Sequence, residues 1–199
     1  MNIITERTVE IPFVLERLPE RGIILDIGCC EATYLNAFKS DARVVYAIDP
    51  RPCFSEIPDG VIFENTDTFN YYPSVRFDCI TCVSTIEHIG LPYYGQPKVY
   101  FGDIVTVRRM YHWLKPSTGM LLLTVPAGRS ATYSWFRQYS PTQLRKLLSC
   151  YHIDEIIYYA FKNERYVPIR EDEVLEYDYH HRVGRAGAVA CCVARRQDR

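Results

Sequence analysis

Acidic residues recur directly after apolar runs of this sequence, at positions where strands would end. The first run ends in Asp26 and Gly28, and the second ends in Asp49, about twenty residues on. A glycine there lets a ligand approach the backbone, and the aspartate can accept both hydroxyls of a ribose. Asp67 follows the third run near Phe69, which suits the exocyclic amine and the face of an adenine ring. A single aspartate after a strand is as often a turn former or helix cap as a ligand-binding residue. Several such residues in this order and at this spacing are much less expected by chance.

The residue best placed for acid–base chemistry is His88, which follows the fourth apolar run in the stretch STIEHIG. The ordinary pKa of histidine suits removal of a proton from a hydroxyl or an amine near neutral pH. The alternative is that Glu87 and His88 only cap and orient this loop. We take His88 as the candidate catalytic residue and leave the capping role open.

Short apolar runs alternating with helical patterns predict the elements that position these residues. The runs lie at 21–28, 42–50, 60–65, 76–85, 119–126, 152–161 and 186–196. Amphipathic patterns predict helices at 31–40, 103–114 and 141–149, the last with Ser140 as N-cap. Continuous apolar strands separated by helices are typical of a parallel sheet covered on both faces, with ligands at the carboxyl ends of the strands. No helical pattern separates the last two runs, so we expect them to pair antiparallel.

Length and composition predict one globular domain over residues 1–199, with a helical lead-in at 1–20 and an insertion at 162–185 between the last two strands. The chain is 48% hydrophobic and 24% charged, as ordinary globular proteins are, and its net charge of −1 gives no strong nucleic-acid signal. The longest apolar stretch is too short to span a bilayer, and no targeting segment is visible. We therefore expect a cytoplasmic protein without membrane partners; the sequence predicts no oligomeric state.

The eight cysteines lie mostly inside apolar runs, which favours free thiols in a reducing cytosol over a disulfide framework. Cys79 and Cys82, three residues apart on an expected strand, should point to opposite faces. The adjacent His180 and His181 should also point apart, and no second cluster lies at ligand spacing. The sequence therefore predicts no metal site, and a solvated hairpin or substrate-side flap around these histidines.

From about Gly22 to Val125, and more loosely to the C-terminus, the sequence resembles the class I S-adenosylmethionine-dependent methyltransferases of the small stand-alone kind. The matching pieces are ILDIGC, VVYAIDP, the acidic loop at Asp67, FDCITCVSTIEHIG and LKPSTGMLLLTVP. The resemblance implies a Rossmann-like three-layer α/β sandwich whose seven-stranded, mostly parallel sheet has an antiparallel last strand. The rival signatures GxGxxG for NAD and GxxxxGK[ST] for a P-loop are absent from this sequence.

The same resemblance implies S-adenosylmethionine as cofactor, with S-adenosylhomocysteine as its product. The implied contacts are Asp26 and Gly28 at the methionine end, Asp49 at the ribose, and Asp67 with Thr68 or Phe69 at the adenine. Cys29, Cys30 and Ser84 complete the predicted cofactor-binding set.

The first cofactor loop departs from the family pattern. That loop usually reads acidic-x-Gly-x-Gly-x-Gly, whereas Cys30 and Ala32 stand here at the second and third glycine positions. Cysteine does not adopt a positive φ as cheaply as glycine does. Either the loop stays in ordinary backbone space, or the cofactor sits slightly differently.

Two segments are expected to border the methyl acceptor. Residues 91–103 form a Gly/Pro/Tyr loop that suits a lid or wall, the alternative being a surface connection with packed tyrosines. Residues 125–139 follow the fifth run. The candidate substrate residues from the two segments are Tyr93, Tyr94, Arg129, Tyr133 and Arg137. Arg137 could pair with an anionic acceptor or equally anchor its loop.

The leading hypothesis is methyl transfer to a small or medium polar acceptor, more at oxygen than at nitrogen. A sugar or glycoconjugate hydroxyl is suggested by the Tyr/Arg rim and by a loose similarity of EHIGLPYYGQP to methyltransferase-like proteins of saccharide pathways. The alternative is a non-catalytic binding or regulatory protein, which the altered glycine loop motivates. A nucleic-acid methyltransferase is third, because the charge balance shows no basic groove and STIEH replaces the Asn/Asp-Pro-Pro-aromatic motif.

Overall fold

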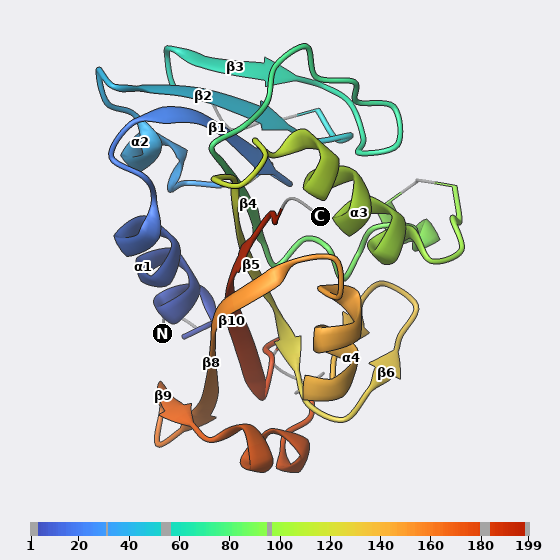
Figure 1. Ribbon diagram of the computed structural model, residues 1–199. Coiled ribbons are helices and arrows are strands. Elements are labelled where there is room, and N and C mark those ends of the chain that lie inside the picture. The colour runs from blue at the N-terminus through green and yellow to red at the C-terminus, as the bar shows by residue number, and fades with distance from the viewer. Residues whose placement is uncertain (1–3, 31, 53–56, 95–96, 180–183, 198–199) are drawn as a thin grey trace.

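An eight-stranded sheet in the order β3-β2-β1-β4-β5-β10-β8-β9 runs through the protein (Figure 1). The computed structural model describes residues 4–30, 32–52, 57–94, 97–179 and 184–197. The strands are β1 (Gly22–Ile27), β2 (Arg43–Ile48), β3 (Val61–Glu64), β4 (Cys79–Val83), β5 (Met120–Ala127), β8 (His152–Lys162), β9 (Arg165–Ile169) and β10 (Ala188–Arg195). Strands β1 to β5 are parallel, whereas β10 is antiparallel to both β5 and β8. The predicted Rossmann-like fold and its antiparallel last pair are confirmed.

The sheet has one strand more than the sequence predicted, because part of the 162–185 segment pairs with its edge. Strand β9 lies antiparallel to β8, and the two-residue turn between them holds Asn163 and Glu164 at φ 49° and 60°. Its five residues include Pro168, which cannot donate to a sheet ladder and so masks the strand pattern in the sequence. The proline is tolerated because β9 is the last strand of the sheet.

Helices cover both faces of the sheet (Figure 1). The α-helices are α1 (Arg7–Arg17), α2 (Leu35–Phe38), α3 (Gly102–Trp113) and α4 (Pro141–Leu147). Phe13 of α1 and Leu35 of α2 share a buried cluster with Ile24 of β1. Met110 of α3 and Leu144 of α4 belong to the cluster on the opposite face. The core thus consists of two apolar layers with the sheet between them.

The predicted helices keep their places with altered lengths. The amphipathic pattern at 31–40 forms only one helical turn, α2, whereas α3 and α4 match their patterns to within one or two residues. The short helices η1 (Pro92–Tyr94) and η2 (Glu171–Glu176) and the two-stranded sheet of β6 (Ala131–Thr132) and β7 (Arg137–Gln138) complete the described elements. These additions lie within the segments expected to border the acceptor and within the 162–185 segment.

The cysteines behave as small apolar residues. Cys79 packs in the α1–α2 layer and Cys82 in the opposite layer, as their spacing predicted. Cys30, Cys79, Cys82, Cys191 and Cys192 are free thiols. Burial raises the pKa of the Cys82 thiol well above its usual range, so this thiol stays protonated and unreactive at neutral pH.

None of the helices in the described part of the chain has both the length and the apolar character needed to cross a bilayer.

Replacing the N-cap of α4 should lower stability without touching the cavity. The Ser140 hydroxyl accepts the Gln143 backbone N–H at 3.3 Å, and Pro141 occupies the first turn of the helix. We expect Ser140→Ala to reduce the free energy of unfolding by about 1 kcal/mol, measured by urea denaturation. Ser149→Ala, an exposed serine beyond the other end of α4, is the matched control and should cost less than about half as much.

Candidate cofactor site

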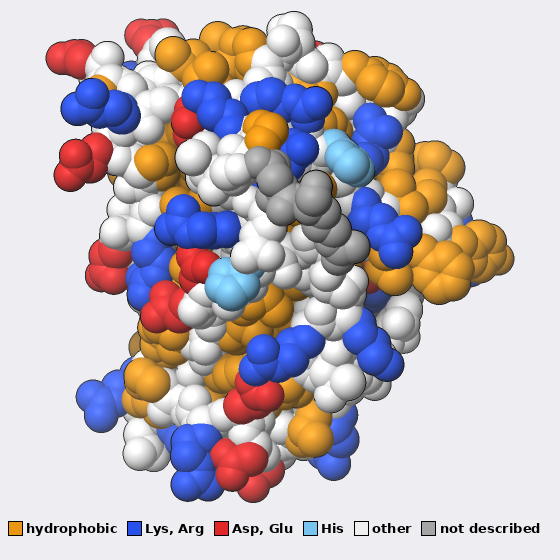
Figure 2. Space-filling model, in the orientation of Figure 1, with side chains coloured by type: hydrophobic (Ala, Val, Ile, Leu, Met, Phe, Trp, Pro, Cys, Tyr) orange, Lys and Arg blue, Asp and Glu red, His pale blue; other side chains and the backbone are white. Residues whose placement is uncertain are grey.

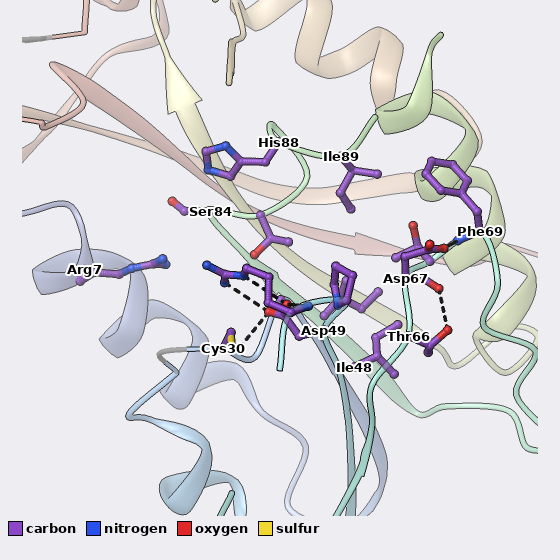
Figure 3. A pocket seen from close by; sticks show the side chains of 16 residues that line it. Arg7, Cys30, Ile48, Asp49, Thr66, Asp67, Phe69, Ser84, His88 and Ile89 are labelled. Carbon is purple, nitrogen blue, oxygen red and sulfur yellow. Dashed lines mark hydrogen bonds and ion pairs between the residues drawn. The ribbon is translucent and has the colours of Figure 1, made fainter. Parts of the chain in front are cut away.

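A cavity of about 810 Å³, counting its open mouth, lies at the carboxyl ends of β1, β2 and β4 (Figure 3). It is lined by Arg7, Ile27, Gly28, Cys30, Ile48, Asp49, Pro50, Arg51, Thr66, Asp67, Thr68, Phe69, Ser84, Thr85, His88 and Ile89. The predicted residues that the structure brings together here are Gly28, Cys30, Asp49, Asp67, Thr68, Phe69, Ser84 and His88. The sequence argument thus found the cavity from the loops that follow its strands.

The turn after β1 needs glycine at one position only. Gly28 has φ +85°, and a Cβ there would lie 2.2 Å from the Thr85 hydroxyl oxygen. Cys30 and Ala32 are not among the residues with positive φ. At Cys30 and Ala32 the backbone therefore stays in its ordinary region, which is the first of the two alternatives that the altered glycine pattern left open.

Asp26 and Cys29 lie buried behind the cavity and do not line it. The Asp26 carboxyl accepts the Thr81 hydroxyl at one oxygen, whereas its Oδ2 atom has no hydrogen-bond partner among the described residues. Burial raises the pKa of Asp26 to about 7, and the hydrogen bond from Thr81 opposes this rise. A buried orphan oxygen beside the first loop is chemically suited to a donor supplied from outside the chain.

Asp49 is the most tightly held polar group of the cavity. Its carboxylate is 2% exposed and accepts the backbone N–H groups of Cys30 and Arg51, both at 2.9 Å. The Arg51 guanidinium also donates to both carboxylate oxygens at 3.3 Å. Asp49 was predicted from the sequence and Arg51 was not, although an arginine two residues after the aspartate in the same loop could have indicated this ion pair.

The adenine-side residues are fixed by short-range hydrogen bonds. The Asp67 carboxylate accepts the backbone N–H groups of Phe69 at 2.7 Å and Asn70 at 2.9 Å. The Thr68 hydroxyl is 2.9 Å from the Thr106 hydroxyl on α3, and the residue is only 4% exposed. This turn holds the Phe69 ring and the Asp67 carboxylate on the cavity wall (Figure 3).

Ser84 closes the floor of the cavity in a strained conformation. Its φ of 41° lies in the left-handed region, and its hydroxyl donates to Oε1 of Glu10 at 2.6 Å. Glu10 comes from α1 and is fully buried, so burial raises the pKa of its carboxyl. The N-terminal segment, expected only as a helical lead-in, thus contacts the site, and no sequence pattern predicted this contact. Strain at a cavity wall that the surrounding hydrogen bonds maintain is typical of functional sites.

His88 is oriented by a residue that the sequence argument did not select. Its Nδ1 atom donates to the Trp135 carbonyl oxygen at 2.6 Å, and its ring stacks on the Trp135 ring at 5.4 Å and 16°. Because a carbonyl only accepts, the Nδ1 atom carries the proton. Burial lowers the pKa of His88, which keeps the ring neutral at pH 7 with its lone pair at Nε2.

Glu87 lies beside that ring. Its Oε1 atom is 3.8 Å from His88 Nε2, and its Oε2 atom has no hydrogen-bond partner among the described residues. The residue is 1% exposed, and burial raises the pKa of its carboxyl well above the usual range. This shift favours the protonated form of the carboxyl group, which can donate a hydrogen bond.

Of the predicted substrate residues, Tyr93, Arg129, Tyr133 and Arg137 do not line this cavity. Arg129 is exposed and pairs with Asp178 at 2.8 Å, and the Tyr133 ring stacks on Phe136 at 4.5 Å. Tyr93 is 59% exposed, with its ring 5.9 Å from Trp135. The Tyr94 side chain lies outside the described residues.

Arg137 lies behind the cavity. Its guanidinium donates to the carbonyl oxygens of Glu87 at 3.2 Å and Ile89 at 2.8 Å, and lies 3.7 Å from the Asp103 carboxylate. These contacts anchor the loop that carries His88, which is one of the two roles left open; binding of an acceptor by Arg137 stays a prediction.

Apolar side chains gather at the edge of the molecule where the segment between η1 and α3 lies (Figures 1 and 2). Tyr100 and Phe101 of this segment are 75% and 70% exposed. Tyr100 and Phe101 are therefore not packed into the domain, and the role of residues 91–103 as a lid or wall stays a prediction.

No group of three His, Cys, Asp or Glu side chains is placed to hold a metal ion within the part of the chain that the structure describes. His180 and His181 lie outside that part, so the interpretation of their segment stays a prediction.

The fold and the cavity together define a Rossmann-like protein whose strand ends form a site for a nucleoside-bearing ligand. Residues 7–161 match the family model described as "Methyltransferase domain". The chain belongs to this family, which confirms the predicted class, the S-adenosylmethionine-dependent methyltransferases. No curated protein matches the chain in sequence.

Solved methyltransferases share the fold at low sequence identity. The N-methyltransferase NodS from Bradyrhizobium japonicum WM9 is 13% identical with a TM-score of 0.66, over 96% of this chain and 94% of that chain. NodS has also been solved in complex with S-adenosylhomocysteine. The Burkholderia thailandensis 1,6-didemethyltoxoflavin-N1-methyltransferase, solved with 1,6-didemethyltoxoflavin and S-adenosylhomocysteine bound, is 14% identical with a TM-score of 0.65, over 95% of this chain and 77% of that chain.

Substitution at Gly28 should weaken cofactor binding, whereas substitution at Cys30 should leave it nearly unchanged. Gly28→Ala forces a side chain into a positive-φ site against Thr85, so we expect at least about tenfold weaker binding of S-adenosylhomocysteine by calorimetry. Cys30→Gly, which restores the usual family pattern, should leave that affinity within about threefold, since Cys30 already has an ordinary φ. A large gain in affinity for Cys30→Gly would show that the cysteine distorts the loop.

The Asp26 carboxyl should make stability depend on pH. Its pKa is raised from 3.8 to about 7 in the folded state, so the folded protein binds this proton more tightly than the unfolded chain. Its stabilising contribution is complete below pH 3.8 and is lost as the pH rises through about 7. We expect the free energy of unfolding of Asp26→Asn, relative to the natural protein, to rise over this interval in urea titrations. Asp41→Asn, an exposed control, should run parallel to the natural protein.

Proposed function

We propose that this protein transfers a methyl group from S-adenosylmethionine to a hydroxyl of a small or medium polar acceptor, with His88 as general base. The observation that carries the proposal is the position of His88 on the cavity wall, with its Nδ1 proton held by the Trp135 carbonyl. The ring thereby presents a basic nitrogen, and its lowered pKa keeps that nitrogen deprotonated at neutral pH.

The chain's own residues provide a fitting place for the cofactor. The positive-φ turn at Gly28, which lines the cavity, suits the amino-acid end. The buried Asp49 carboxylate suits the ribose hydroxyls once Arg51 moves aside, and Asp67 with Phe69 suits the adenine. When bound, the cofactor supplies an electrophilic methyl group on a sulfonium. The protein contributes orientation, exclusion of water and removal of the acceptor's proton.

A hydroxyl acceptor is favoured because it keeps its proton at neutral pH and so gains most from a base. The exposed aromatic segment between η1 and α3 and the stacked rings of His88 and Trp135 suit the apolar face of a sugar ring, which supports a sugar or glycoconjugate hydroxyl. An amine is the second candidate, because the solved structures that share this fold include two N-methyltransferases.

The ordinary φ of Cys30 speaks for binding of the cofactor and against the non-catalytic alternative. The free thiols of Cys79, Cys82, Cys191 and Cys192 support our proposal that the protein works in the cytoplasm.

The acceptor can be found by supplying the purified protein with methyl-labelled cofactor and a fractionated metabolite extract. Carbon chemical shifts of the labelled product distinguish a methoxy from an N-methyl group. A methoxy product supports the proposal, and an N-methyl product replaces it with the amine candidate. Absence of transfer to any fraction, with S-adenosylhomocysteine binding intact, favours the binding-protein alternative.

Removing the base should slow turnover and change its pH dependence. We expect kcat to fall about 100-fold or more in both His88→Gln and His88→Ala, measured by release of S-adenosylhomocysteine. In the natural protein the rate should fall as the pH drops below the lowered pKa of His88, whereas the residual rate of His88→Gln should be flat there. His152→Gln, an exposed control on β8, should keep full activity. Full turnover in both His88 variants would exclude the general base.

A further inference from the structure

We infer that Arg7, the first residue of α1, binds the carboxylate of the cofactor's methionine moiety. The inference rests on the placement of the methionine end beside Gly28 and is independent of the acceptor. It gives the N-terminal helix a direct part in cofactor binding, beyond its packing against the sheet.

The position of Arg7 places its guanidinium over the first loop. The Arg7 side chain extends from α1 toward the cavity (Figure 3). Arg7 also lines a smaller neighbouring cavity beside α2, and the residues common to both cavities are Arg7, Gly28 and Cys30. A ligand group bound against the turn at Gly28 therefore has Arg7 as the cation on the opposite side.

One nitrogen of the Arg7 guanidinium is hydrogen-bonded within the protein, and its other nitrogens remain available to a ligand. Its Nη1 atom donates to Glu10 Oε2 at 3.3 Å and to the Val83 carbonyl oxygen at 3.2 Å. Its Nε and Nη2 atoms make no hydrogen bond to any residue that the structure describes, and the side chain is 44% exposed. Glu10 is itself fixed by Ser84, so the orientation of Arg7 is set before a ligand arrives. An arginine in this state offers a preorganised donor pair to a carboxylate.

The charges of the cavity point to the same assignment. Its lining includes two arginines, Arg7 and Arg51, and a histidine that burial keeps neutral. Arg51 belongs to the ribose end, where it pairs with Asp49. The one anionic group of S-adenosylmethionine is its carboxylate, and Arg7 is the lining cation at the end where that group would lie.

The rival explanation is that Arg7 serves only as counterion for the buried Glu10. Two ligands separate the explanations, because 5′-methylthioadenosine keeps the adenosine and sulfur of S-adenosylhomocysteine but lacks the amino-acid part. A contact to the carboxylate affects only S-adenosylhomocysteine. A loss of packing or of the Glu10 pair affects both ligands alike.

The test is calorimetric titration of both ligands into the natural protein, Arg7→Gln, Arg7→Lys and Arg17→Gln. Arg17 lies on the same helix and pairs with Glu155 at 2.9 Å, so it is the matched control. For Arg7→Gln we expect S-adenosylhomocysteine to bind about tenfold to hundredfold more weakly, and 5′-methylthioadenosine to bind within about threefold of the natural protein. Arg17→Gln should change neither affinity.

Arg7→Lys keeps the charge beside Glu10 but not the planar fork. It should lose less affinity for S-adenosylhomocysteine than Arg7→Gln does, and it keeps the test decisive if Arg7→Gln unfolds. Equal losses for both ligands, or no loss for either, in the variants that fold would overturn the inference. If the natural protein binds neither ligand, the proposed cofactor site fails and the inference fails with it.

Discussion

The turn that follows β1 is the constraint on which the rest of the site depends. At Gly28 the chain takes a positive φ so close to Thr85 that no side chain fits. The turn aims the Cys30 N–H at Asp49 and so joins the ends of β1 and β2. With Thr85 packed against it, the end of β4 is joined to them as well. One residue without a Cβ thereby brings three strand ends around a single cavity, and the other glycines of the family pattern become dispensable.

The sequence could predict the site residues whose positions follow from the order of strands along the chain. A parallel sheet places consecutive strand ends along one edge, so Asp49, Asp67 and His88 could be brought together from their positions after apolar runs alone. Arg7 could not, because the packing angle of α1 against the sheet is encoded by no local pattern. Trp135 lies in the 125–139 segment that the sequence placed beside the acceptor, but its contact with His88 could not be predicted. The strand β9 was not predicted for another reason. Its proline argues against a strand, except in a strand at the edge of a sheet, which is where β9 lies.

The floor of the cavity concentrates groups that a purely structural core would avoid. Asp26, Glu10 and Glu87 are at most 1% exposed, and burial raises the pKa of each. Burying each of these carboxyl groups costs desolvation free energy that a buried apolar side chain would not cost, and Ser84 adds backbone strain beside them. Such costs cluster where a site must be shaped and charged before its ligand arrives. The floor therefore supports a binding role independently of the family match.

Different parts of the chain form the cofactor side and the proposed acceptor side of the site. This separation explains why the cofactor side is easier to predict from the sequence than the acceptor side. The cofactor side is made of short loops directly after β1, β2 and β3. The acceptor side is assembled from separate segments that Arg137 joins through the carbonyl oxygens of Glu87 and Ile89. Because that anchor lies behind His88, residues on the exposed rim can change while the base keeps its orientation. If the rim binds the acceptor as proposed, the choice of acceptor depends on the residues that the core of the fold constrains least.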